Sequence, residues 1–291
     1  MRELTVTTQD GRVLEVTDAA ESRGPVLLFH HGTPSSRALF SPWVTEAESR
    51  GARLITYNRP GYGGSDPHPG RTVADVASDV RAIADQLGIE RFATFGLSGG
   101  GPHTLACAAL LPDRVTAAAS MAGVGPNDAD DLDFTAGMGE DNVEEFEAAI
   151  AGRDVLAPML EGLRAEMLEA DAAAVTEVLR TVLSDVDVAA MSGEIGEIFV
   201  AWTREALEKG VEGWVEDDLA FAAPWGFDLA DIQVPILLWQ GSQDRMVPEA
   251  HGRWLAAHIP AVDARLRPDE GHLTLVTTRV GETFDWLLSH N

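Results

Sequence analysis

The chain has 291 residues, 45% of them hydrophobic and 23% charged, with a formal net charge of −26. This composition predicts a soluble globular protein of one domain, or of one domain with a large insertion. The charge argues against nucleic acid and anionic membranes as partners, because both would repel it, and no segment reaches the roughly 18 consecutive apolar residues of a membrane span. A small-molecule partner is expected instead.

The cysteine content, the first residues and the charge distribution bear on disulfide bonds, on location in the cell and on where the acidic charge lies. Cys107 is the only cysteine, so an internal disulfide is excluded and a core role in a helix is expected. The first residues lack the apolar run of a signal peptide, and we therefore expect a cytoplasmic protein. Residues 126–225 hold 25 acidic and 5 basic side chains, which is most of the net charge. The sequence leaves the choice between a monomer and a homo-oligomer open.

Strand and helix patterns alternate along both flanks of the chain. Such alternation predicts an α/β fold with a mostly parallel, right-handed doubly wound sheet of seven or eight strands flanked by helices. In chain order, we expect a hairpin over residues 4–16, a strand at 25–32, a helix at 37–49, a strand at 52–58, a helix at 72–87, a strand at 92–98, a helix at 102–111, strands at 114–123 and 234–241, a helix at 249–257, a strand at 264–268 and a helix at 279–289.

The central segment, residues 125–225, contains no convincing strand and reads as an all-helical insertion. Helical runs are expected at residues 142–152, 155–170, 172–183 and 195–210. One face of the second run carries apolar residues at helical spacing, namely Leu156, Met159, Leu160, Leu163, Met167 and Leu168. We therefore expect a core domain formed by residues 1–124 and 226–291, with residues 125–225 as a helical cap over the carboxyl edge of the sheet.

Ser98 lies between an expected strand and an expected helix, in the pattern Gly96-Leu97-Ser98-Gly99-Gly100. A serine on a tight strand-to-helix turn needs glycines two residues to either side, where side chains would collide with neighbouring elements. The pattern alone is weak, because glycine and serine are common. Its position after an apolar strand and before a helix favours a nucleophile at a nucleophile elbow over an ordinary loop.

A serine nucleophile needs a general base and a group that orients the base. Asp244 follows the strand expected at 234–241, and His272 follows the last expected strand. Taken singly, Asp244 could cap the next helix and His272 could lie on the surface. Their order after Ser98 favours a catalytic triad. Asp269 and Glu270 share the loop of His272, so Asp244 is the better orienting residue.

Acyl transfer also requires hydrogen-bond donors for the oxyanion. One donor is expected to be the backbone N–H of Gly99, at the positive end of the helix. The second is expected to be the N–H of Thr33 in the segment HHGTP, where His31 and Gly32 shape the turn and His30 has a structural role.

Together, the segments HHGTP, YNRPGYGGSD, FGLSGGGP, GSQDRMVP and EGHLTL resemble the α/β-hydrolase family with a helical cap. The resemblance implies an eight-stranded core, the triad Ser98, His272 and Asp244, and an oxyanion hole at Thr33 and Gly99. Epoxide hydrolases and haloalkane dehalogenases use aspartate where this chain has Ser98 and are set aside. Haloperoxidase-like members keep the serine, but are set aside because their cap is generally less elaborate.

The remaining features have structural interpretations. Residues 58–66 lack the lysine of a phosphate loop and read as a turn near the site. No metal or cofactor is expected, since the other histidines lack metal-ligand spacing and read as surface or helix residues: His68, His103, His251, His258 and His290. The acidic charge of the cap reads as a solvated surface rather than a receptor for a cationic group. Five aromatic residues either line an apolar pocket or pack the core, namely Phe199, Trp202, Trp214, Phe221 and Trp225.

Three hypotheses of function follow. The leading one is a carboxylesterase-like serine hydrolase that cleaves a small carboxylic ester, or a related acyl bond, through an acyl-enzyme. The second is a peptidase like the prolyl aminopeptidases, with the acidic cap binding a free amino terminus. Against it, those enzymes usually have a tryptophan after the serine and DQRG where this chain has NRPG. The third is a non-catalytic hydrolase-fold receptor for a small ligand.

Overall fold

A computed structural model describes residues 1–19, 23–191 and 193–291. Its centre is an eight-stranded sheet in the order β1-β2-β4-β3-β5-β6-β7-β8. The pairs β1–β2 and β2–β4 are antiparallel and the other five described pairs are parallel, which confirms the expected mostly parallel sheet. The strands are β1 (Arg2–Thr7), β2 (Val13–Asp18), β3 (Val26–His30), β4 (Arg53–Tyr57), β5 (Phe92–Leu97), β6 (Val115–Met121), β7 (Ile236–Gly241) and β8 (Val262–Arg267).

The central strands are buried on both faces. Every residue of β3, β5, β6 and β7 is buried, whereas the edge strands β1 and β8 are more exposed. Successive side chains point to opposite faces, so Leu27 packs in one hydrophobic cluster and Leu28 in another. Continuous apolar strands of this kind need helices on both sides.

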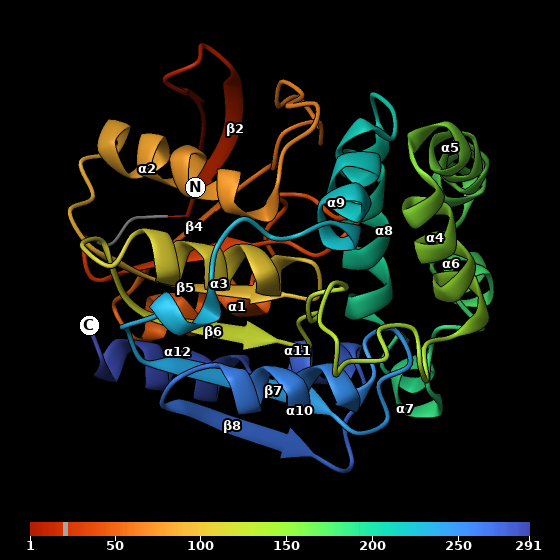
Figure 1. Cartoon of the computed structure of the whole chain (residues 1–291). Helices are drawn as coiled ribbons and strands as arrows, with labels where there is room; N and C mark the ends of the chain where they lie inside the picture. The colour runs from red at the N-terminus through yellow and green to blue at the C-terminus, as the bar shows by residue number, and fades with distance from the viewer. Residues whose placement is uncertain (20–22, 192) are drawn as a thin grey trace.

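Helices cover the two faces as the crossovers require (Figure 1). On one face lie α2 (Val76–Gln86), preceded by the 3-10 turn η1 (Val73–Asp75), then α3 (Gly100–Leu110) and α10 (Glu249–His258), with η2 (Leu229–Asp231) nearby. On the other face lie α1 (Ser41–Ser49) and α12 (Val280–Ser289), while the short α11 (Leu273–Thr278) joins β8 to α12. Cys107 is buried in α3, as expected.

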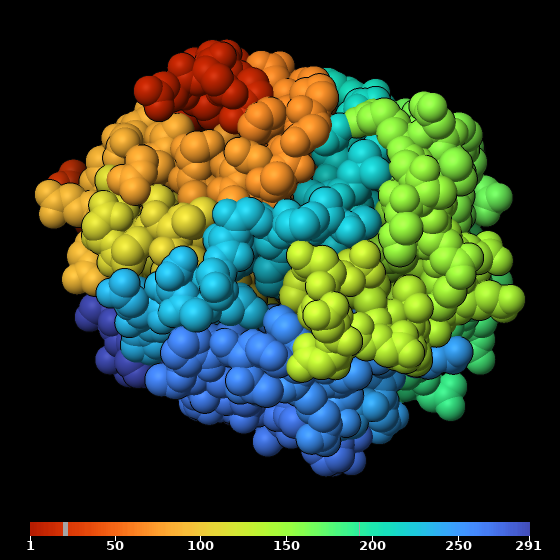
Figure 2. Space-filling model, viewed as in Figure 1, coloured from red at the N-terminus to blue at the C-terminus, as the bar shows by residue number. Residues whose placement is uncertain are grey.

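Six α-helices lie between β6 and β7 in the described part of the chain, and we call them the inserted helices. The strands β6 and β8 point toward them in Figure 1, and in Figure 2 they form the yellow-green to cyan surface on the right. Several of them pack around their own apolar cluster, which includes Leu156, Leu160 and Trp214. They are α4 (Glu140–Ala151), α5 (Arg153–Glu169), α6 (Ala172–Val178), α7 (Asp185–Ala190), α8 (Glu194–Leu207) and α9 (Glu212–Ala222).

The inserted helices differ from the sequence expectation in number. Four helical runs were expected, and the structure adds α7 and α9. The run expected at 172–183 ends earlier, at Val178. Within the described part of residues 125–225, no strand is found. No helix in the described ranges is both long and apolar enough to cross a bilayer.

Candidate active site

The turn between β5 and α3 holds Ser98 in an unusual backbone conformation. Ser98 has a φ of 56°, in the left-handed region that residues other than glycine seldom adopt. Its N–H donates to the carbonyl of Met121 at 2.9 Å. A side chain at Gly96 would collide with the carbonyl oxygen of Gly100, and one at Gly100 with that of His30. The flanking glycines are therefore required by close backbone packing. Strain of this kind often marks a functional residue.

His272 and Asp244 lie against each other beyond the ends of β8 and β7. His272 Nδ1 lies 2.7 Å from Asp244 Oδ2, and both side chains are buried. Asp244 Oδ1 accepts from the N–H groups of Met246 at 2.9 Å and Val247 at 2.8 Å. Because an ionised carboxylate can only accept hydrogen bonds, the neutral imidazole carries its proton on Nδ1, and Nε2 is the basic nitrogen. His272 is therefore not a surface residue, and Asp244 is the group that orients it.

The surroundings of His272 set its basicity. Burial lowers the pKa of the imidazole, but the charge of Asp244, its hydrogen bond and the charge of Asp187 outweigh this and raise the pKa above 6.5. Burial raises the pKa of Asp244 above 3.8, although His272 and the N–H of Val247 act in the opposite direction. We assign Asp244 the ionised form at neutral pH, because its oxygens accept from several donors.

The turn after β3 lies beside the residue that follows Ser98. A Cβ atom added to Gly99 would collide with the hydroxyl of Thr33 and would lie 3.0 Å from the ring of Phe221. A Cβ atom added to Gly32 would lie 3.6 Å from Ser98 Cβ. The structure therefore brings Thr33 and Gly99, the two expected oxyanion donors, next to each other and to Ser98.

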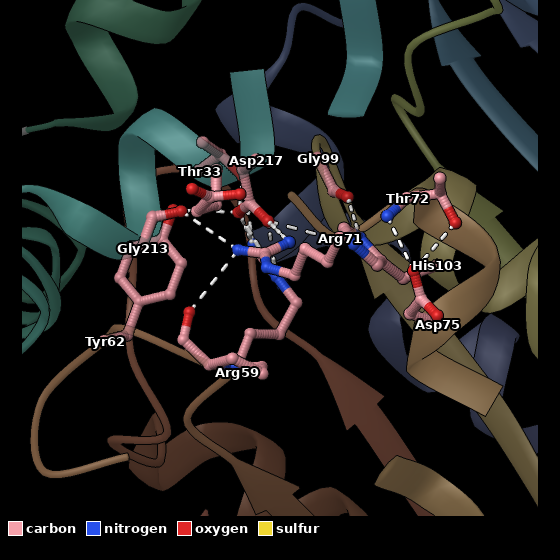
Figure 3. Close-up of polar contacts among 12 residues, drawn as sticks. Thr33, Arg59, Tyr62, Arg71, Thr72, Asp75, Gly99, His103, Gly213 and Asp217 are labelled. Atoms are coloured by element: carbon pink, nitrogen blue, oxygen red, sulfur yellow. Dashed lines mark hydrogen bonds and ion pairs between the residues drawn. The ribbon is translucent and has the colours of Figure 1, made fainter. Parts of the chain in front are cut away.

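A buried cluster centred on Asp217 of α9 supports this turn (Figure 3). The carboxylate accepts from Arg59 Nη2 at 2.5 Å, Arg71 Nη1 at 2.6 Å, Thr33 Oγ1 at 2.7 Å and Tyr62 Oη at 2.8 Å. Burial raises the pKa of Asp217, but the two guanidinium charges hold it well below 3.8. An inserted helix is thus joined to the turn after β3 by charge-assisted hydrogen bonds.

Arg59 binds three consecutive residues of that turn. It donates to the carbonyl of His31, to the carbonyl of Gly32 at 2.8 Å and to Thr33 Oγ1 at 2.9 Å. The expectation that residues 58–66 form a structural turn near the site agrees with this placement. The specific role of Arg59 was missed, because its partner Asp217 lies 158 residues away in the sequence.

Two of the histidines expected at the surface or in helices lie in helices and are buried. They are His103 in α3 and His251 in α10. Burial lowers the pKa of His103 to about 3 and that of His251 to about 4, so both are neutral at pH 7. His30 Nδ1 lies 3.0 Å from the hydroxyl of Tyr57, which fits its structural role. Within the described residues, no group of three or more His, Cys, Asp or Glu could hold a metal ion.

Ser98 and His272 line the same cavity, which has a volume of about 140 Å³. Four of the five aromatic residues singled out in the sequence also line it: Phe199, Trp202, Trp214 and Phe221. The fifth, Trp225, does not line it and stacks on Phe227 at 5.7 Å between ring centres. The cavity is largely apolar, as ligand pockets usually are.

Three carboxyl groups from the inserted helices also line the cavity, namely Asp141, Glu145 and Asp218. Burial raises the pKa of both Glu145 and Asp218, and the neighbouring Glu145 raises the pKa of Asp218 further. Among the described lining residues there is no lysine or arginine. The expectation of a solvated acidic surface does not hold for four carboxylates, since Asp187, Glu216, Asp217 and Asp218 are buried.

Comparisons with known proteins agree with this fold. The profile of a family described as "alpha/beta hydrolase fold" matches residues 25–168. A non-heme chloroperoxidase of Streptomyces lividans is 28% identical over 92% of this chain and 91% of its own length. An alpha/beta hydrolase fold protein of Nakamurella multipartita is 26% identical, with a TM-score of 0.66 over 99% of both chains.

A thermophilic esterase of Thermogutta terrifontis is similar in fold, with a TM-score of 0.71, 22% identity and full coverage of both chains. Because the chloroperoxidase matches 92% of this chain, haloperoxidase-like proteins stay among the relatives of this protein.

Proposed function

Since the chain belongs to the α/β-hydrolase family of enzymes, we propose that it is a serine hydrolase that cleaves small carboxylic esters or related acyl bonds. The observation that carries this proposal is the 2.7 Å contact between His272 and Asp244, at the cavity that Ser98 also lines. A small-molecule substrate agrees with a cavity of about 140 Å³. Residues 125–225 act as the cap over a core of residues 1–124 and 226–291.

The proposed reaction uses the three residues as base, nucleophile and orienting group. His272 Nε2 takes the proton of the Ser98 hydroxyl while Ser98 Oγ attacks the carbonyl carbon. The N–H groups of Gly99 and Thr33 donate to the oxyanion, and the alcohol leaves with the proton from His272. Water then attacks the acyl-enzyme by the same route. Asp244 holds the imidazole and stabilises its charged form.

The charge of the cavity predicts the kind of acyl group that it accepts. Asp141, Glu145 and Asp218 face a substrate with no cationic lining residue beside them. We expect 4-nitrophenyl pentanoate to be hydrolysed with a kcat/KM at least about tenfold higher than 4-nitrophenyl hemiglutarate, because the carboxylate of the hemiglutarate would leave water without a described lysine or arginine in the lining to balance it.

The two esters differ chiefly in the terminal group of the acyl chain, so their rates isolate the effect of charge. The measurement is initial-rate kinetics at pH 8, with a thioester and an anilide of the same neutral acyl group beside them. If the protein hydrolyses none of these compounds, the proposed function is contradicted. Equal rates for the neutral and the anionic ester would contradict the charge argument alone.

A second candidate function is favoured by the position of Asp218. Asp218 and Phe221 are three residues apart on α9, so they lie about one helical turn from each other, and Phe221 contacts Gly99. An ammonium group a few bonds from the scissile carbonyl could therefore reach Asp218 and Glu145. The test compares alanine methyl ester with the near-isosteric methyl isobutyrate. With each rate divided by the uncatalysed hydrolysis rate of the same ester, a preference of about tenfold or more for the alanine ester supports an aminoacyl hydrolase, and a preference for isobutyrate removes this candidate.

A further inference from the structure

Asp187 of α7 binds the backbone on either side of the His272 side chain. Its Oδ2 accepts from the N–H of His272 at 3.0 Å, and its Oδ1 accepts from Leu273 at 2.7 Å and Thr274 at 3.2 Å. The hydroxyl of Ser184 donates to Oδ2 at 2.6 Å. Asp187 has no exposed surface. A carboxylate from an inserted helix thus accepts hydrogen bonds from three consecutive N–H groups of the core.

These N–H groups begin α11 and have no acceptor within that helix. His272 occupies the position before the helix, where a side chain usually accepts the first N–H bonds, but its side chain makes no such bond. The imidazole instead contacts Asp244. Asp187 supplies the missing acceptor from another part of the chain, and its charge also suits the positive end of a helix.

The loop that carries His272 approaches the carboxylate of Asp187 closely at Gly271. A Cβ atom at this position would collide with the carboxylate of Asp187. The backbone conformation of Gly271 does not itself demand glycine, since its φ lies outside the left-handed region. The absence of a side chain therefore provides room for Asp187.

We propose that Asp187 is a positioning residue, which holds the backbone of His272 so that the imidazole reaches both Asp244 and Ser98. The inference rests on the proposed function. A fixed backbone matters because a shift of about 1 Å in a catalytic group can cost about 100-fold in rate. The inserted helices would then hold the general base, His272, in position as well as cover the cavity.

The charge of Asp187 also acts on the imidazole. Two carboxylates face His272 from other elements, Asp244 in the loop after β7 and Asp187 in α7, and both raise its pKa against the effect of burial. On its own loop, Glu270 is bound by Arg279 at 2.8 Å. Removing the charge of Asp187 is therefore expected to lower the pKa of His272.

The test is Asp187→Asn, with Asp185→Asn as the matched control, because Asp185 lies in the same helix and is exposed. For Asp187→Asn we expect kcat to fall at least about tenfold. The acidic limb of the kcat/KM profile should move to lower pH, since the base must be neutral and its pKa is lower. The control should match the wild type in both respects.

A second readout does not depend on turnover. The pKa of His272, followed by NMR of the imidazole, should fall in Asp187→Asn and stay unchanged in the control. If Asp187→Asn does not fold, Gly271→Ala replaces it, because the added methyl group displaces the carboxylate and should move the pKa in the same direction.

An unchanged pKa of His272, or a kcat within about twofold of the control, would overturn the role of Asp187. Failure of the wild type to hydrolyse any ester would instead overturn the proposed function, while the NMR titration still decides the role of Asp187.

Discussion

Replacing Ser98 with alanine is expected to lower kcat on a neutral aryl ester by about 10⁴-fold or more, because no acyl-enzyme can form. Folding should change little. Alanine removes one hydroxyl from a partly buried position and leaves the N–H bond to Met121 in place. The measurements are steady-state kinetics and the melting temperature of both proteins.

Ser35→Ala is the matched control, since Ser35 is another serine that lines the same cavity. Its kcat should stay within about threefold of the wild type, because no catalytic step uses it. A Ser98→Ala rate within about tenfold of the wild type, with the control unchanged, would be incompatible with a serine nucleophile at this position.

Asp217→Asn is expected to destabilise the protein by about 3–5 kcal/mol, because it leaves Arg59 and Arg71 buried without a balancing charge. Asp217 is 0% exposed and Arg59 is 1% exposed, so water cannot compensate. The change also loosens the turn that carries Thr33, and we expect kcat to fall with it. Urea unfolding at pH 7 measures the free energy difference.

Glu212→Gln is the control for Asp217→Asn. Glu212 begins the same helix and pairs with Arg153 at 2.9 Å, but this pair is exposed and should contribute no more than about 1 kcal/mol. If the two variants unfold at the same urea concentration, the cluster around Asp217 does not stabilise the fold as described.

The positions of Ser98, Asp244 and His272 could be predicted because each lies in the segment that follows a strand of the parallel part of the sheet. Carboxyl ends of parallel strands meet at one edge, so residues far apart in sequence are brought to one place. The glycines around Ser98 were predictable for a similar reason, since the tight turn leaves no room for side chains.

Asp187 and Asp217 could not be predicted, because nothing local distinguishes them from the other 23 of the 25 acidic residues in residues 126–225. Their roles come from partners that lie 85 residues away for His272 and 158 residues away for Arg59. Only the packing of the inserted helices against the core selects these two carboxylates for burial.

Helices α7 and α9 were missed for physical reasons as well. Helix α9 buries Glu216, Asp217 and Asp218 together with apolar side chains, so its buried face cannot be recognised from hydrophobic periodicity. Helix α7 has 6 residues, which is too short for the pattern to repeat. Buried charge and short length both remove the signal on which a helix prediction depends.

The central claim is that Ser98 is the nucleophile, and covalent labelling tests it most directly. Incubation with an organophosphonate, followed by digestion and mass spectrometry, should find one adduct, on the peptide that contains Ser98, and none in Ser98→Ala. Loss of ester hydrolysis should parallel labelling. An active protein in which Ser98 stays unlabelled, or an adduct on another residue that accounts for the lost activity, would contradict the account.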